Sequence, residues 1–143
     1  MSTVIDGDFR DALARLVHER FGGRLVDLRR LSGGASQELW AFDVESNGRR
    51  TPLILRRNPG GAIRRETAAG METEARLIRL AEQAGARVPP VAYVLSPEDR
   101  LGAGFLMERI EGETLARRLL RDAEFAEARK KLAFELGEAA ARI

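Results

Sequence analysis

Residues 31–57, LSGGASQELWAFDVESNGRRTPLILRR, combine a glycine turn, a hairpin and a strand that ends in arginine. We expect one strand at 25–31, before the glycines, and a second strand that follows them to about Val44. A third strand at 53–55 leads into Arg56. Glycines let the backbone approach phosphate groups closely, and a cation on a neighbouring strand can meet their charge. The stretch therefore predicts a small antiparallel sheet able to hold a triphosphate.

Alternation along these strands separates two faces of the predicted sheet. The more apolar face of the second strand, expected to face the core, is formed by Trp40, Phe42 and Val44. Asn47-Gly48 predicts a two-residue turn, and Pro52 can stand only at the start or edge of the third strand. In that third strand Ile54 and Arg56 share one face, and the opposite face holds Leu53, Leu55 and Arg57.

Outside this stretch, apolar periodicity predicts more helices and strands. The expected elements are a helix at 8–21, the three strands above, a long helix at about 65–84, strands at 91–95 and 104–107, and helices from 114 to 143. Asp6 or Asp8 would cap the first helix, and Gly85 would end the second. This order lacks a regular βαβ alternation, so it predicts an α+β domain with a mainly antiparallel sheet of about five strands.

Composition narrows the class of protein. The 143 residues are enough for one domain with a single core, and they contain no cysteine, which excludes disulfides and thiolate zinc sites. No apolar run approaches the ~20 residues of a membrane span, and the acidic N-terminus is unlike a secretory signal. A cytoplasmic protein without a membrane partner is expected. His18, the single histidine, is interpreted as an edge-of-helix residue rather than a metal ligand or catalytic group.

The basic residues are almost all arginine. Only Lys130 and Lys131 are lysines among the 24 basic residues, and 22 acidic residues leave a net charge of +2. A G-x-x-x-x-G-K-[ST] phosphate loop does not occur, so phosphate contacts before residue 130 must come from arginine, hydroxyls or backbone N–H groups. Interspersed acids and few aromatics argue against a nucleic-acid partner.

Four features follow one another in an order that is more informative than any one of them. They are Gly33-Gly34 between two strands, L-I-L-R at 53–56, Glu74 on the next helix, and L-M-E-R-I-E-G at 106–112. This layout resembles the small lobe of protein kinase-like folds and is especially similar to the aminoglycoside phosphotransferase (APH) family. The resemblance covers roughly residues 25–112 and continues more loosely to the end.

The resemblance implies a nucleotide-binding site that takes ATP or GTP with Mg²⁺. Its residues would be Gly33, Gly34, Ala35, Ser36, Ile54, Arg56, Glu74, Met107, Glu108 and Ile110. The loop at 33–36 would bind phosphates through backbone N–H groups, and Arg56, held by Glu74, would clamp phosphate oxygens. Ile54 would lie against the adenine.

At the other end of the implied site, Met107 would limit the depth of the pocket. Glu108 would offer a backbone carbonyl and Ile110 a backbone N–H to the adenine edge, so ATP and GTP are not distinguished. The resemblance divides the chain into an N-terminal nucleotide-binding lobe at 1–112 and the start of a helical C-terminal lobe at 113–143. The first includes a leading helix at 8–21, the sheet and helix at 25–109, and a link at 108–112.

Members of this family carry their catalytic aspartate and metal ligands in H-G-D-x-x-x-x-N and later D-x-D-type segments after the link, and neither follows the link here. The catalytic aspartate is therefore expected beyond Ile143, and no catalytic residue is assigned within the chain. We expect a truncated, inactive lobe of an ATP-dependent kinase that acts on a small-molecule hydroxyl, with the metal held mainly by the missing lobe. Exposed stripes on the helices after Thr114 would favour self-association.

Simpler interpretations stay open. The glycine pair could be an ordinary turn, Arg56 and Arg57 a solvated strand end, and Glu74 an exposed helix residue. Trp40 is expected to be a core residue rather than a stacking platform. For the whole chain, the alternative function is a non-catalytic binding or interaction module of kinase-like fold.

Overall fold

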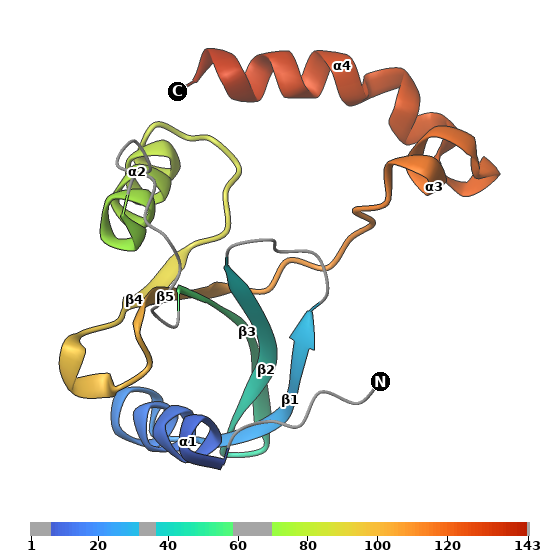
Figure 1. Cartoon of the computed structure of the whole chain (residues 1–143). Helices are drawn as coiled ribbons and strands as arrows, with labels where there is room; N and C mark the ends of the chain where they lie inside the picture. The colour runs from blue at the N-terminus through green and yellow to red at the C-terminus, as the bar shows by residue number, and fades with distance from the viewer. Residues whose placement is uncertain (1–6, 32–36, 59–69, 143) are drawn as a thin grey trace.

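A computed structural model describes residues 7–31, 37–58 and 70–142 of the chain (Figure 1). Its elements are α1 (Gly7–Phe21), β1 (Arg24–Leu31), β2 (Glu38–Ser46), β3 (Arg49–Asn58), α2 (Met71–Gln83), β4 (Val91–Val94), η1 (Pro97–Asp99), β5 (Ala103–Glu108), α3 (Ala116–Arg121), η2 (Ala123–Phe125) and α4 (Ala126–Ala141). The predicted succession of helices and strands is confirmed for the described residues. The predicted start of the second helix, at about residue 65, the glycine turn at 33–36 and Ile143, the last residue of the predicted C-terminal helices, lie outside them.

The strands form one five-stranded sheet in the order β1-β2-β3-β5-β4, and every neighbouring pair is antiparallel. This confirms the α+β class and gives the chain the small lobe of a kinase-like fold. β3 lies in the middle of the sheet, with β2 on one side and β5 on the other. The residues at the end of β3 are therefore held by hydrogen-bonded strands on both sides.

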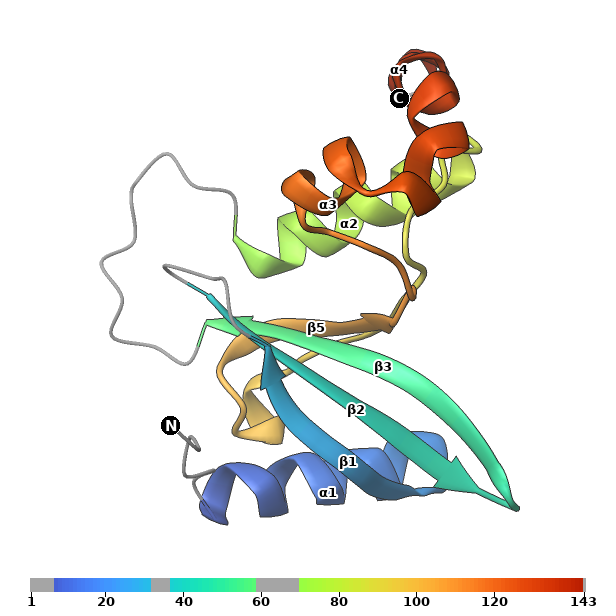
Figure 2. The same ribbon diagram turned by 90° about the vertical axis from the view of Figure 1, so that its right-hand side faces the viewer.

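Helix α1 covers one face of the sheet and α2 covers part of the other (Figure 2). The core under α1 includes the predicted inward face of β2, and its buried residues are Phe9, Leu13, Leu16, Val17, Leu25, Trp40, Phe42, Val44, Leu53, Leu55, Leu101 and Leu106. Trp40 is 4% exposed, with its ring centroid 4.7 Å from that of Phe9. The interpretation of Trp40 as a core residue is confirmed.

The smaller core lies on the opposite face, under α2. Its buried residues are Met71, Ala75 and Phe105, and Met107 packs against them. Helix α2 ends at Gln83, and Gly85, two residues later, has a φ of +81° and donates its N–H to the carbonyl of Glu82. Because a Cβ is unfavourable at this φ, glycine ends the helix at the predicted place.

Asn47 and Gly48 form the turn between β2 and β3, and Pro52 marks the point where one side of β3 becomes an edge. Asn47 and Gly48 both have positive φ, of 52° and 74°, as a tight hairpin turn requires. Pro52 lies inside β3 rather than at its start, but only residues 53–58 of β3 pair with β5. The carbonyl of Pro52 accepts the N–H of Arg109 on that side. Pro52 therefore stands where one side of β3 is an edge, as expected.

The residues after the link form α3 and α4, which are joined by η2. Arg129 ties the two together, because its Nη1 donates to the carbonyls of Leu119 and Asp122 at 2.9 and 2.8 Å. Neither helix has a buried residue, and the exposed apolar side chains there are Leu115, Leu120, Leu132, Phe134 and Leu136. In the described part of the chain, no helix has the length and apolar character needed to span a bilayer.

Candidate functional site

Arg56 stands near the end of the central strand β3 and points to the face covered by α2. Its Nη2 lies 2.8 Å from Oε1 of Glu74, and the two side chains are 32% and 26% exposed. Ion pairs with this much exposure contribute at most about 1 kcal/mol to stability. The main effect of the pair is therefore to orient the guanidinium, with strand arginine and helix carboxylate meeting as the sequence resemblance implies.

Gln37 is a second partner of Arg56 that sequence reasoning missed. It stands one residue before β2 and is half-buried, and its Oε1 accepts a hydrogen bond from Nε of Arg56 at 2.7 Å. Its position directly after the predicted glycine turn was the only feature of the sequence that could have pointed to this contact. An amide side chain has many possible partners, so this one could not be deduced without the structure.

Gly104 lies opposite Arg57 in the register and lets β5 approach β3 closely beside the backbone of Arg56. A Cβ built on Gly104 would lie 2.5 Å from the carbonyl oxygen of Arg56 and 2.9 Å from Cβ of Arg57. These atoms belong to the neighbouring strand and its first side-chain carbon, which cannot move aside cheaply. The position of Arg56 over α2 therefore depends on a residue without a side chain in the adjacent strand.

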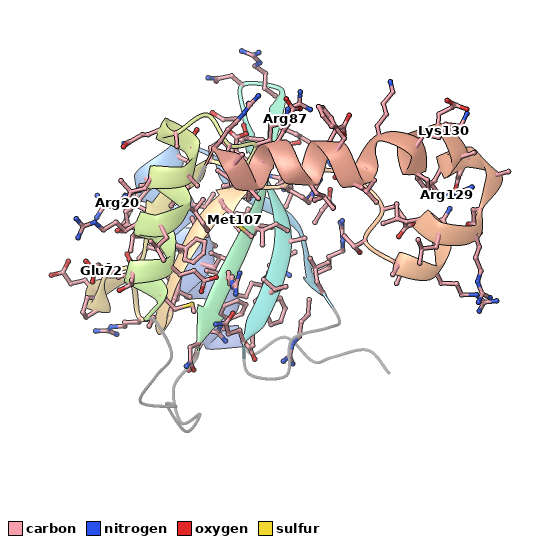
Figure 3. The ribbon with its side chains drawn as sticks, turned by 90° about the horizontal axis from the view of Figure 1, so that it is seen from above. Arg20, Glu72, Arg87, Met107, Arg129 and Lys130 are labelled. Carbon is pink, nitrogen blue, oxygen red and sulfur yellow. The ribbon has the colours of Figure 1, made fainter. Side chains whose placement is uncertain are left out.

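Ile54 and Met107 form the apolar surface next to this ion pair. Ile54 precedes Arg56 by two residues on the same face, is 7% exposed, and lies opposite Met107 of β5 in the register. Met107 packs against the small core and lies beside α2 (Figure 3). An apolar surface with a cation at one end suits a ligand that has a flat ring and anionic groups.

The link after β5 is held by backbone hydrogen bonds on both sides. The N–H of Glu108 donates to the carbonyl of Pro90 at 3.0 Å, and that of Arg109 to the carbonyl of Pro52 at 3.1 Å. Ile110 is 66% exposed, and no described residue accepts a hydrogen bond from its N–H. The link is therefore anchored as far as Arg109, and the N–H of Ile110 is open to a ligand.

Arg109 anchors the link through its side chain as well, another contact that sequence reasoning missed. Its Nη1 donates to Oδ1 of Asp43 at 2.8 Å, and its Nε donates to Oε1 of Glu111 at 2.7 Å. Burial by itself would lower the pKa of Arg109, but the hydrogen bonds to Glu111 and Asp43 raise it, so the guanidinium stays charged. The sequence feature that could have pointed to this contact is Asp43, on the Ile54 side of β2, because a carboxylate on a largely apolar face needs a partner.

Arg57 points to the opposite face of the sheet, toward α1, where it contacts residues of the fold. Its Nε donates to Oε2 of Glu38 at 2.8 Å, its Nη1 donates to the carbonyl of Leu101 at 3.2 Å, and its guanidinium lies 4.0 Å from the ring centroid of Phe9. Burial would raise the pKa of Glu38, but hydrogen bonds from Trp40 and Arg57, together with nearby arginine charges, lower it below its ordinary value. This arginine joins β3 to β2 and α1.

The predicted phosphate loop lies outside the described residues, and a surface hollow lies away from the Arg56–Glu74 pair. Gly33, Gly34, Ala35 and Ser36 lie outside the described residues, so their phosphate-binding role stays a prediction. A surface hollow of about 530 Å³ lies away from the Arg56 pair and is lined by Arg10, Ala14, His18, Gly23, Arg24 and Leu25. Within residues 7–31, 37–58 and 70–142, no group of three or more His, Cys, Asp or Glu side chains is placed to hold a metal ion.

Comparison with known proteins agrees with this architecture. The model of the phosphotransferase enzyme family (APH) matches residues 27–143, a stretch that runs from the middle of β1 through the other strands, the Arg56–Glu74 pair, the link and the helices after it. A search among curated proteins gave no match. The chain belongs to the phosphotransferase enzyme family.

Proposed function

We propose that the α2-facing side of the sheet binds ATP or GTP, and that the chain supplies the nucleotide-binding part of a phosphotransferase that acts on a small-molecule hydroxyl. The observation that carries the proposal is the Arg56–Glu74 ion pair at the end of the central strand. It holds a cation beside the apolar surface of Ile54 and Met107, in a chain of a family of phosphotransferases. A cytoplasmic location, where nucleotide triphosphates are abundant, fits this proposal.

The order of groups along β3 gives the bound nucleotide its direction. The anchored link and Pro52 lie at one end, Ile54 in the middle and Arg56 at the other end. The base would lie on Ile54 and Met107, with its edge toward the link, and the phosphates would reach Arg56. A guanidinium binds phosphate oxygens through fixed, planar N–H groups, so its orientation by Glu74 matters for affinity.

Transfer of the phosphoryl group needs chemistry beyond this face. No H-G-D-x-x-x-x-N segment follows the link, and no Mg²⁺ ligand is assigned to a described residue. The catalytic aspartate expected beyond Ile143 stays a prediction. Mg²⁺ bound with the nucleotide would neutralise phosphate charge. We therefore propose that these 143 residues bind and orient the nucleotide without turning it over by themselves.

Calorimetric titration with ATP and Mg²⁺ tests the proposal. Arg56→Ala removes the only cation assigned to the phosphates and should weaken binding at least about tenfold, the effect of losing one charge-assisted hydrogen bond. Arg15→Ala is the matched control, because Arg15 is exposed on α1, which covers the opposite face of the sheet (Figure 2). Absence of ATP binding by the wild-type chain, or equal affinities of wild type and Arg56→Ala, would contradict the proposal.

A second candidate function is a non-catalytic interaction module of the same fold. The observation in its favour is the exposure of large apolar side chains on α3 and α4, among them Phe134 at 72% and Leu120 at 65%. Such side chains favour association, either with another protein or with a second copy. The same titration separates the two candidates, since a module that only contacts proteins would not need Arg56 or bind ATP.

A further inference from the structure

Gln37 and Glu74 approach Arg56 from two different elements. Gln37 stands one residue before β2 and its Oε1 accepts a hydrogen bond from Nε at 2.7 Å, while Glu74 comes from α2 and its Oε1 lies 2.8 Å from Nη2. In the planar guanidinium, Nε and Nη2 share one edge. Two partners on that edge, held by separate elements, restrict the rotation of the group more than either partner alone.

The remaining nitrogen of Arg56 is left available. Within the part of the chain that the structure describes, no acceptor lies on Nη1 of Arg56. This nitrogen carries two N–H donors and belongs to a side chain that is 32% exposed. An anion can therefore reach the guanidinium at Nη1 without displacing Gln37 or Glu74.

The neighbouring arginine shows the contrast. Arg57 is paired with Glu38 in the same cross-strand manner, but there Nη1 is already used by the carbonyl of Leu101 and the side chain is only 13% exposed. Every nitrogen of Arg57 has a partner, as in a structural group. Arg56 has a neutral partner, a charged partner and, among the described residues, no partner on its third nitrogen, as in a group prepared for a ligand.

We propose that Gln37 is a positioning residue, which holds Arg56 so that Nη1 meets a phosphate of the bound nucleotide. This inference rests on the proposed function and adds to it a residue that acts through Arg56. The neutral amide restrains the guanidinium without adding negative charge. A carboxylate at position 37 would join Glu74 in neutralising Arg56, and the site would then repel phosphates.

The test measures dissociation constants for ATP with Mg²⁺ and for adenosine in parallel. Gln37→Ala should weaken ATP binding about fivefold, and Gln37→Glu, which keeps the shape of the side chain, should weaken it more than about tenfold. Adenosine has no phosphate, so its affinity should stay within about twofold. Gln83→Ala and Gln83→Glu, at the exposed end of α2, are matched controls that should change neither affinity.

The outcomes separate this inference from the proposed function. Failure of the wild-type chain to bind ATP contradicts the proposed function and the inference with it. If wild type binds ATP and Arg56→Ala weakens it while both Gln37 variants bind like wild type, only the inference is overturned. Equal weakening of ATP and adenosine, or an ATP effect of Gln37→Ala that Gln83→Ala reproduces, also overturns it, because the role would then be structural.

The Nε–Hε signal of Arg56 in nitrogen-15 NMR supplies a second readout. In the wild-type chain this proton is donated to Gln37, so it should exchange slowly with water and shift in Gln37→Ala. In Gln83→Ala it should stay where it is. An unchanged Nε–Hε signal in Gln37→Ala would overturn the inference even in a variant of normal stability.

Discussion

Arg56 and Arg57 are adjacent residues with opposite roles. Strand alternation sends Arg56 toward α2 and Arg57 toward α1, where it meets Glu38, Phe9 and the carbonyl of Leu101. The side chains of Arg57 and Glu38 are 13% and 19% exposed, against 32% for Arg56. Burial and full pairing make Arg57 a structural residue, and partial exposure leaves Arg56 accessible to a ligand.

Glu38 makes the stability of the folded chain depend on pH. Burial would raise its pKa, but hydrogen bonds from Trp40 and Arg57 lower it overall, so the unfolded chain binds the proton more tightly than the folded one. Its stabilising contribution is complete above the ordinary carboxyl pKa of 4.5 and is lost as pH falls through the lower folded value. We predict that Glu38→Gln costs about 1–3 kcal/mol at neutral pH.

Urea unfolding of wild type and Glu38→Gln between neutral pH and about pH 3 checks this prediction. The difference between the two should shrink as the solution becomes more acidic. Glu19→Gln, an exposed position on α1, is the control and should leave the curve unchanged. A difference that is constant over the whole range would show that Glu38 is not the titrating group.

At the residue scale, sequence reasoning found the Arg56–Glu74 pair but missed Gln37 and the Arg109–Asp43 contact. The first pair was implied by the resemblance to a known family layout, and the two side chains meet in the structure. Asp43 and Arg109 are 66 residues apart, and their contact depends on the register of three strands and on the path of the link. Such a contact between distant side chains has no local pattern in the sequence.

Among the elements, the β3–β5 pair decides where the site lies. Gly104 leaves no room for a side chain between the strands, because a Cβ there would lie 2.5 Å from a backbone oxygen of Arg56. We predict that Gly104→Ala destabilises the fold by about 1–3 kcal/mol, since β5 must move away from β3. Chemical denaturation measures this cost.

Gly137→Ala provides the contrast for this element. Gly137 lies in α4, and a Cβ on it would meet nothing within 4 Å, so alanine there should be neutral or stabilising by roughly 0.5–1 kcal/mol. Equal stabilities of Gly104→Ala and wild type would show that the two strands can separate at no cost. The position of Arg56 would then not depend on this contact.

The helix expected at 8–21 matches α1 closely, whereas the strand expected at 53–55 is shorter than β3. Alternation gave the two faces of β2 and β3, and Asn47-Gly48 gave the turn, because these signals are local. The expected start of the second helix falls outside the described residues and stays a prediction. Pro52 was placed at a strand start or edge, and the structure shows that β3 begins earlier and that its open side begins at this residue.

Over the whole molecule, the sheet with α1 and α2 differs from α3 and α4 in burial. The cores on both faces of the sheet include fully buried side chains such as Phe42 and Phe105, while α3 and α4 bury none. The division into lobes at residue 112 and self-association through α3 and α4 stay predictions. The difference in burial itself predicts a difference in local stability.

Hydrogen exchange measures this difference. We predict that backbone amides of α4 exchange at least about tenfold faster than those of β2, β3 and β5, because opening α4 exposes little new apolar surface. Peptides from α1 serve as the internal control, since Leu13 and Val17 there are fully buried. Protection of α4 equal to that of β3 would show that α4 unfolds only together with the sheet.

The most direct test of the central claim is an NMR titration of the wild-type chain with ATP and Mg²⁺. The account predicts that the largest shifts occur at Ile54, Arg56, Met107 and Ile110, on the α2-facing side and in the link, and that the surface hollow near His18 stays unchanged. Shifts confined to that hollow, or no shifts at millimolar ATP, would contradict the claim that the Arg56 face binds the nucleotide.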